Sequence, residues 1–371
     1  MAQTSDHAAD APERDGAVAF SAAGLQAFVT AALERAGVPP AGAETVAASL
    51  VDADLRGIHS HGVTRTGIYL ERLRLGGNVA RAEVSVIAQA PALTLLDGAN
   101  VLGQIASARA VEIALEQAAS VGAAAVCVRN GSHFGATGYW TRRIAQAGCL
   151  GLASTNGTPL MVPWGSVAAA MGTNPLAMAF PSSGAAPVVV DFATSETTWG
   201  ALLGARAAGA EIPRSWALDG EGNPTSDATV AVAAGRLMPF GRHKGSALAV
   251  GVELLSGALA GAQCLSAVAD MYGSPELPNG LGHFFLAVDP SVLGDAGAHF
   301  ADAVHAVQVE LNGLPAAPGV ERVLWPGQPE AECAAERLRT GIPLPEATVA
   351  DLEAVARATG VDLSSARFQV G

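Results

Sequence analysis

Apolar and polar residues alternate with a helical period in the N-terminal part of the chain. Over residues 21–36, apolar side chains recur every three or four positions, which predicts an amphipathic helix with one buried face. Ser21 precedes this run as its predicted N-cap, and Gly37 follows it as the expected stop. The same period predicts helices over residues 43–56 and 66–75, each followed by glycine.

Short apolar runs replace this pattern after residue 91. A helix predicted over residues 104–120 separates the first two runs, and further helices are expected over residues 329–339 and 346–359. Alternating strands and helices predict a layered α/β fold. Residues 245–261 are apolar on nearly every face, so we expect a buried helix there. The predicted strands cover residues 92–96, 124–128, 150–154, 176–180, 188–190 and 284–288.

Composition and charge exclude several classes of function. The net charge of −13 over 371 residues argues against nucleic-acid binding, which requires a basic surface. No uncharged apolar run reaches the roughly 18 residues of a membrane span, and the polar start contains no secretory signal. Four cysteines without a Cys-x-x-Cys pair indicate free thiols in a cytoplasmic protein and no metal site. Residues 1–17 are predicted to be a disordered tail.

Residues 55–65 gather polar side chains in an otherwise alanine-rich chain. Ser60 and His61 place a hydroxyl beside an imidazole, and Arg65 offers the planar guanidinium that binds a carboxylate at two points. This combination suits a 2-oxo or 2-hydroxy acid, because one group handles a proton while another holds the carboxylate. A structural histidine is the alternative interpretation for His61, and we assign that role to its neighbour His59.

A second polar stretch follows the strand predicted over residues 124–128. His133 lies there in a glycine-rich turn, the usual position of ligand sites in α/β proteins, although a plain tight turn has the same sequence features. Polar residues also end two later strands, around Asn174 and Asp191, as ligand contacts or as turns. Lys244 lies at a predicted helix start, where a phosphate would meet its ammonium group and helix N–H groups; a solvated cap is the alternative.

Two common nucleotide-binding motifs do not occur in the chain. No Gly-x-Gly-x-x-Gly follows a predicted strand, and no Gly-x-x-x-x-Gly-Lys-Ser/Thr is present. An ordinary Rossmann fold and a phosphate-loop enzyme are therefore not supported.

The polar stretches together resemble the type 2 malate/L-lactate dehydrogenase family, which includes ureidoglycolate and sulfolactate dehydrogenases. The resemblance covers about residues 20–345 and implies a non-Rossmann, L-sulfolactate dehydrogenase-like α/β fold. It implies that residues 91–289 form a central NAD(P)-binding part. Residues 18–90 with 290–371 would form a helical part for dimerisation and substrate binding, in a homodimer. The matching pieces are Arg56-Gly-Ile-His-Ser-His-Gly62 with Arg65, Ser132-His-Phe-Gly-Ala-Thr-Gly138, Thr155-Asn156 with Pro159, Val162-Pro-Trp-Gly165, Gly172-Thr-Asn-Pro175, Asp191-Phe-Ala-Thr-Ser195, His243-Lys-Gly245 and Trp325-Pro-Gly327.

The resemblance also implies an activity and assigns roles to residues. The activity is hydride transfer between NAD or NADP and C2 of a small 2-hydroxy or 2-oxo acid, such as malate or lactate. His133, His61 and Ser60 would be catalytic, with either histidine as the acid/base. Arg65 would bind the substrate carboxylate. The residues implied at the cofactor are His133, Asn156, Gly157, Thr173, Asn174, Asp191, Ala193, Thr194, Lys244 and Gly327.

The chain departs from the family pattern around the lysine. Arg242 adds positive charge where a phosphate would lie, so both NAD and NADP stay open. A sister branch of the family reduces cyclic imino acids, Δ1-piperideine-2-carboxylate and Δ1-pyrroline-2-carboxylate. The Gly-Ala-Thr-Gly that ends at Gly138 favours the hydroxy-acid branch. A non-catalytic dimeric scaffold is the third hypothesis, and the retention of His61 and His133 argues against it.

Overall fold

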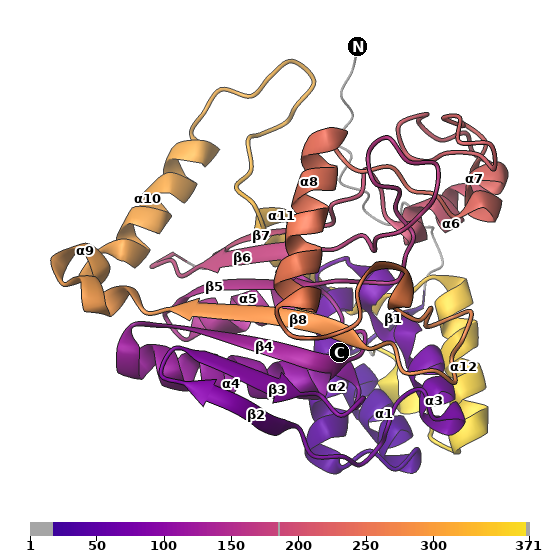
Figure 1. The fold of residues 1–371 in the computed structure, drawn as a ribbon, viewed down its shortest axis with the longest axis horizontal. Coiled ribbons are helices and arrows are strands. Elements are labelled where there is room, and N and C mark those ends of the chain that lie inside the picture. The colour runs from indigo at the N-terminus through magenta and orange to yellow at the C-terminus, as the bar shows by residue number, and fades with distance from the viewer. Residues whose placement is uncertain (1–17, 185, 369–371) are drawn as a thin grey trace.

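A seven-stranded mixed sheet forms the centre of the molecule (Figure 1). The computed structural model describes residues 18–184 and 186–368, so the tail expected over residues 1–17 lies outside it. Only β3 and β4 run parallel; every other pair of neighbouring strands is antiparallel. In order across the sheet, the strands are β2 (Ser85–Ala90), β3 (Leu93–Asp97), β4 (Ala123–Gly131), β8 (Leu281–Val288), β5 (Leu150–Thr155), β6 (Leu176–Phe180) and β7 (Val188–Phe192).

Helices α4 (Gly103–Val121) and α5 (Thr137–Gln146) cover one face of this sheet. Their apolar stripes meet the inward-facing side chains of β4 and β8, and Trp140, Ile144 and Phe285 are fully buried between the layers. This packing explains why the apolar runs of the sequence are short. Each strand needs only enough residues to cross one helix layer.

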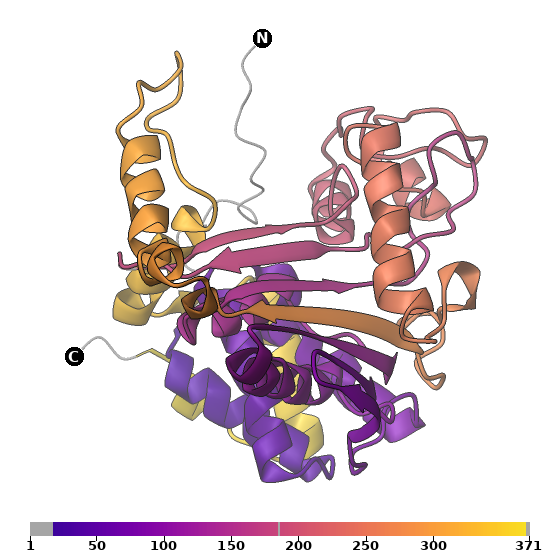
Figure 2. The same ribbon diagram turned by 60° about the vertical axis from the view of Figure 1, so that its left-hand side comes forward.

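A helical part made from both chain ends lies against the α4–α5 layer (Figure 2). It contains α1 (Ala22–Arg35), α2 (Pro40–Leu55), α3 (Thr66–Leu75), α11 (Gln328–Thr340) and α12 (Glu346–Thr359). Ser21 caps α1 as expected, because its Oγ accepts the Gly24 N–H at 3.0 Å. Strand β1 (Ala19–Phe20) pairs with β9 (Ile342–Pro343) and joins the two ends. These features confirm the α/β fold with a helical part from both ends.

Several elements were not predicted. Strand β2 is exposed along its length, and α6 (Trp199–Ala208) and α7 (Ala228–Ala234) belong to a separate apolar cluster beyond the ends of β5 to β7. Helices α9 (Asp295–Ala298) and α10 (Phe300–Asn312) extend from the far end of β8 (Figure 1). The remaining short turns are η1 (His59–His61), η2 (Val63–Arg65), η4 (Leu265–Ala267), η5 (Pro290–Leu293) and η6 (Ser364–Ala366).

The expectation of a buried helix over residues 245–261 is wrong. Helix α8 (His243–Val252) continues as the π-helix η3 (Glu253–Ala258), and Val250, Leu254 and Leu259 are 43 %, 58 % and 55 % exposed. The helix stands on the outside of the sheet and buries only one side, through residues such as Ala249 and Val252 (Figure 1). A helix whose side chains are apolar on every face can therefore still expose one of these faces to solvent. None of the helices described is both long and apolar enough to span a membrane.

Candidate active site

A buried carboxylate shapes the loop that carries the first histidine. Asp54, near the end of α2, is 1 % exposed; its Oδ1 lies 2.6 Å from His59 Nδ1, and its Oδ2 accepts the Val63 N–H at 2.7 Å. Burial raises the pKa of Asp54, although His59, Val63 and Arg337 act in the opposite direction. These two bonds fold residues 59–65 into η1 and η2, which turn His61 and Arg65 to one side.

Helix α11 holds the same loop from the other end of the chain. Arg337 Nη1 lies 2.9 Å from His59 Nε2 and donates to the Asp54 carbonyl oxygen at 2.5 Å. Because an arginine can only donate, His59 Nε2 accepts, and its Nδ1–H donates to Asp54. His59 is thus a structural histidine, as its sequence position suggested. Arg337 is a residue that the sequence reasoning missed.

The two candidate catalytic histidines lie together. The rings of His61 and His133 stack with centroids 5.4 Å apart at an interplanar angle of 24°. Ser60 Oγ lies 3.0 Å from His61 Nδ1, and Tyr69 Oη lies 2.7 Å from His133 Nδ1. These contacts use one nitrogen of each ring, and within the described residues neither Nε2 atom has a hydrogen-bond partner, so both can meet a ligand. The structure therefore brings together two stretches about 70 residues apart in the sequence.

Both rings are neutral near pH 7. The pKa of His61 falls to about 3, first because of burial and then because of the Arg65 charge. The pKa of His133 also lies well below its ordinary value, again chiefly through burial, with further repulsion from Arg65 and His61. A neutral imidazole can accept or donate a proton at its free nitrogen, which is the property an acid/base residue needs.

Arg65 presents its guanidinium beside these rings. Its Nε donates to the Ser60 carbonyl oxygen at 2.6 Å, and no hydrogen bond within the described residues uses Nη1 or Nη2. The ring of Tyr272 lies 5.6 Å from Arg65 Cζ. The Nε hydrogen bond fixes the orientation of the guanidinium, and Nη1 and Nη2 remain available to bind a carboxylate.

Tyr69 and Gln104 support His133 from behind. Gln104 Nε2 donates to Tyr69 Oη at 3.0 Å, and both side chains are buried. The sequence did contain a signal for Tyr69, because it lies in the first turn of the predicted helix over residues 66–75, four residues after Arg65. Gln104 carried no such signal, since it comes from α4 and meets Tyr69 only in the folded chain.

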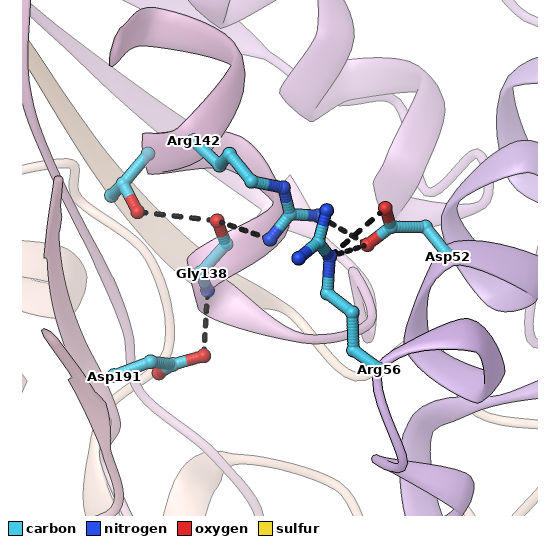
Figure 3. A network of polar contacts seen from close by, with 6 residues as sticks. Asp52, Arg56, Gly138, Arg142 and Asp191 are labelled. Carbon is cyan, nitrogen blue, oxygen red and sulfur yellow. Dashed lines mark hydrogen bonds and ion pairs between the residues drawn. The ribbon is translucent and has the colours of Figure 1, made fainter. Parts of the chain in front are cut away.

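The turn after His133 is tied to the sheet and to α2 (Figure 3). Gly138, in the first turn of α5, donates its N–H to Asp191 Oδ2 at 2.7 Å. Arg142 pairs with Asp52 of α2, which Arg56 also contacts at 3.2 Å. The surrounding protein raises the pKa of Asp191 to about 6 by desolvating its carboxyl group, although part of this side chain is still exposed to solvent. A Cβ at Gly138 would lie 2.8 Å from Asp191 Oδ2, so the glycine permits this approach.

The amides of Asn156 and Asn174 turn inward. Their Nδ2 atoms donate to the buried Glu253 at 3.0 and 2.7 Å, and Asn156 also bonds the Gln263 carbonyl oxygen and the Gly282 N–H. Asn174 Oδ1 is buried and has no partner within the described residues. Both side chains therefore hold the strand ends in place, and contact with a cofactor at these positions would involve the backbone.

The other candidate cofactor residues lie at neighbouring strand ends. Thr194, which follows Ala193 after β7, donates its N–H to the Thr173 carbonyl oxygen at 2.8 Å, and a Cβ on Gly172 would lie 2.6 Å from the Gly157 backbone. Gly327 packs on β7, where an added Cβ would lie 3.0 Å from Val189. Lys244 is exposed in the first turn of α8.

These residues fit a dinucleotide. Gly157 and Gly172 let two strand ends lie directly against each other, and Asp191 is exposed, with one oxygen not used by Gly138. Lys244 supplies a positive charge that suits a phosphate. Within the described ranges, no group of three or more histidine, cysteine, aspartate or glutamate side chains could hold a metal ion.

Comparison with known proteins identifies the family and agrees with the fold. The family model described as malate/L-lactate dehydrogenase matches residues 20–353. A (2R)-3-sulfolactate dehydrogenase (NADP(+)) from Chromohalobacter salexigens is 35 % identical over 331 residues, covering 89 % of this chain and 96 % of the relative.

Solved structures show the same architecture. The malate dehydrogenase from Pyrococcus horikoshii OT3 superposes with a TM-score of 0.87 at 30 % identity, covering 95 % of this chain and 98 % of the other. The Δ1-piperideine-2-carboxylate reductase from Pseudomonas syringae pvar. tomato gives 0.82 at 30 % identity, covering 91 % and 99 %. The fold and the family match place the chain among oxidoreductases of the non-Rossmann dehydrogenase class. The chain belongs to the malate/L-lactate dehydrogenase family.

Proposed function

We propose that the protein transfers a hydride between NAD(P) and C2 of a small 2-hydroxy or 2-oxo acid. The observation that carries this proposal is the stack of neutral His61 and His133 beside the available edge of Arg65. A 2-hydroxy acid needs a carboxylate partner and a proton acceptor within a few ångströms of each other, and this cluster provides both. When bound, NAD(P) supplies the site that accepts or returns the hydride.

Each residue of the cluster has a part in the proposal. Arg65 binds the carboxylate through Nη1 and Nη2 and so fixes C2 beside the rings. His133 takes the hydroxyl proton during oxidation and returns it during reduction, through its free Nε2. His61, with Ser60 on its Nδ1, binds the substrate oxygen and assists the proton transfer.

The cofactor part of the proposal rests on the strand-end residues. Asp191 and the backbone at Gly157, Thr173 and Ala193–Thr194 would contact the nucleoside, and Lys244 a phosphate. Arg242, next to Lys244 and exposed, would add affinity for the extra phosphate of NADP. The sulfolactate relative that uses NADP(+), as its name states, supports including NADP alongside NAD.

We also infer that the protein forms a homodimer in the cytoplasm. The support for a dimer is two groups of exposed apolar side chains, Val250 of α8 with Leu254 of η3, and Val307 with Val309 of α10, each more than 40 % exposed. Exposed apolar patches on a protein surface commonly mark sites of contact with another protein.

A substrate panel followed by NAD(P)H absorbance tests the reaction. We expect turnover with oxaloacetate, pyruvate or sulfopyruvate, and none with Δ1-piperideine-2-carboxylate. The opposite pattern would give the protein the activity that the solved reductase is named for. Absence of turnover with every compound and both cofactors would favour a non-catalytic scaffold.

Two variants then test the roles of the histidines. His133→Asn should lower kcat by about two to four orders of magnitude, the range for a lost acid/base, while cofactor affinity holds. His61→Asn should mainly raise KM. If His61→Asn abolishes turnover and His133→Asn barely changes it, the two roles are reversed.

A further inference from the structure

A buried chain of three polar groups ends at the proposed acid/base. Gln104 Nε2 lies 3.0 Å from Tyr69 Oη, and Tyr69 Oη lies 2.7 Å from His133 Nδ1. Gln104 and Tyr69 are buried, and burial raises the pKa of Tyr69 to about 12, so its hydroxyl stays protonated. A protonated phenol can donate one hydrogen bond and accept another at the same time.

The other end of the Gln104 amide is what makes this chain unusual. Its Oε1 is buried and has no hydrogen-bond partner within the described residues. A buried carbonyl without a partner costs free energy, and among the described residues the bond to Tyr69 Oη is the only side-chain hydrogen bond that orients this amide. Either end of the amide can therefore face Tyr69, because the two ends have nearly the same size.

The two orientations have opposite effects on His133. When Gln104 presents N–H to Tyr69, the Tyr69 hydroxyl donates to His133 Nδ1, and the neutral ring carries its proton on Nε2. When Gln104 presents Oε1, the Tyr69 hydroxyl donates to Gln104, and His133 Nδ1–H donates to Tyr69. His133 Nε2 then has a free lone pair.

We propose that Gln104, acting through Tyr69, selects which nitrogen of His133 carries the proton, and that rotation of its amide switches His133 between base and hydrogen-bond donor. This inference rests on the proposed acid/base role of His133. During oxidation, the hydroxyl proton of the substrate moves to His133 Nε2 while the hydride leaves C2 for NAD(P). The resulting imidazolium keeps Nδ1–H on Tyr69 and Tyr69 O–H on Gln104. Tyr69 and Gln104 are positioning residues, since neither touches the substrate in this scheme.

The other titratable groups near His133 all change its pKa in the same direction. Arg65, His61, His283 and Arg72 all lower its pKa, together with burial. None of them contacts His133 Nδ1, so the Tyr69–Gln104 pair is the part of this environment that can alternate.

The test uses the matched variant Gln104→Met, which keeps the length of the side chain and removes the amide. Tyr69 then has only His133 Nδ1 as an acceptor, so the Nε2–H tautomer is fixed. Long-range ¹H–¹⁵N spectra of ¹⁵N-histidine enzyme, with the His133 signal identified by His133→Asn, should show both tautomers in the wild type and only Nε2–H in Gln104→Met. In Tyr69→Phe no hydroxyl contacts His133 Nδ1, so this contact should no longer favour the Nε2–H tautomer of His133.

A pH profile gives a second measurement. In Gln104→Met the imidazolium leaves the Tyr69 donor without an acceptor. The midpoint of kcat/KM for oxidation should therefore move down by about one pH unit, and its plateau should fall roughly tenfold. Gln308→Met serves as the control, because Gln308 is a buried amide on α10, bonded to Ala186 and Ser182. Its profile should match the wild type.

The outcomes separate this inference from the proposed function. If folded Gln104→Met keeps the wild-type tautomer ratio and midpoint, the switch does not exist, while the role of His133 stands. If His133→Asn keeps full turnover, the acid/base assignment fails; the spectra still report whether Gln104 sets the tautomer, because they need no activity.

Discussion

Arg65 shows how one side chain can be held and still be available. Its Nε is fixed on the Ser60 carbonyl oxygen and its plane lies near Tyr272, while Nη1 and Nη2 have no partner among the described residues. Arg65→Lys keeps the positive charge but removes the two-point geometry. We expect KM to rise and kcat/KM to fall by roughly ten- to a hundredfold or more. Steady-state kinetics with the preferred acid give the answer, and an unchanged kcat/KM would remove Arg65 from the site.

Individual residues of the site differ in how far sequence could identify them. His61, Arg65 and His133 stand out because polar groups are rare in this chain and these cluster. Asn156 and Asn174 were also candidate cofactor residues, but their side-chain amides donate hydrogen bonds to Glu253. No local pattern reveals that difference, because the partner lies about 80 to 100 residues away and its burial depends on tertiary packing.

At the scale of elements, the η1–η2 loop depends on a glycine. A Cβ at Gly62 would lie 2.2 Å from the buried Asp54 carboxylate, whereas one at Gly67 would meet nothing within 4 Å. Gly62→Ala should displace Asp54 or the loop, lowering stability by about 1–3 kcal/mol and kcat/KM at least tenfold. Gly67→Ala, inside α3, should be neutral or stabilising by about 1 kcal/mol. Urea unfolding and kinetics of the pair test this, and equal behaviour of both variants would contradict it.

Helix α8 provides a second prediction at this scale. Lys244 lies exposed in its first turn. The backbone N–H groups of Lys244 and Gly245 donate to the Gly241 and Phe240 carbonyl oxygens, so the ammonium group is the part of this turn that could meet a phosphate. Lys244→Ala should weaken NAD(P)H binding, and the loss should shrink as salt rises, because ions screen a phosphate contact. Fluorescence titration at low and high salt measures this effect. Equal affinity of variant and wild type at low salt would exclude a phosphate role.

Elements with a clear period and a capping residue were predictable. Helices α1 and α3 end at the expected glycines, and the buried strands β3 to β8 stand out as apolar runs. The misses have a common cause. Strand β2 and helices α6, α7 and α10 bury few side chains, so they do not form the buried apolar elements by which a core is identified from sequence. For α8 the sequence predicted burial on every face, but the apolar side chains on its outward face are exposed.

The whole molecule carries a pH dependence from its buried histidines. His283 of β8 is fully buried, with Nδ1 on the Thr155 hydroxyl at 2.8 Å, and burial lowers its pKa to about 3. The unfolded chain takes up a proton near pH 6.5, whereas the folded chain does not. Stability is therefore complete above pH 6.5 and is lost as the pH falls toward 3, by roughly 1.4 kcal/mol per pH unit for this group.

His283→Gln tests that dependence. The variant should be less stable at pH 7, yet its unfolding free energy should fall less steeply between pH 6.5 and 4.5 than that of the wild type. The matched control is His299→Gln, whose side chain is 79 % exposed and should leave the slope unchanged. Urea unfolding at several pH values gives the slopes, and parallel curves for wild type and His283→Gln would refute the assignment.

The joining of both chain ends has a consequence for how the protein is made. His59 and its partner Arg337 are separated by 278 residues, and β1 pairs with β9 over a similar distance. A ribosome adds about 5–20 residues per second, so roughly 15 to 55 seconds pass between the synthesis of the two partners. During this time the segment with His61 and Arg65 is translated but lacks the helix that holds it. We therefore expect chains that end before α11 to lack the contact that holds this loop, and to become active only after α11 has been synthesised.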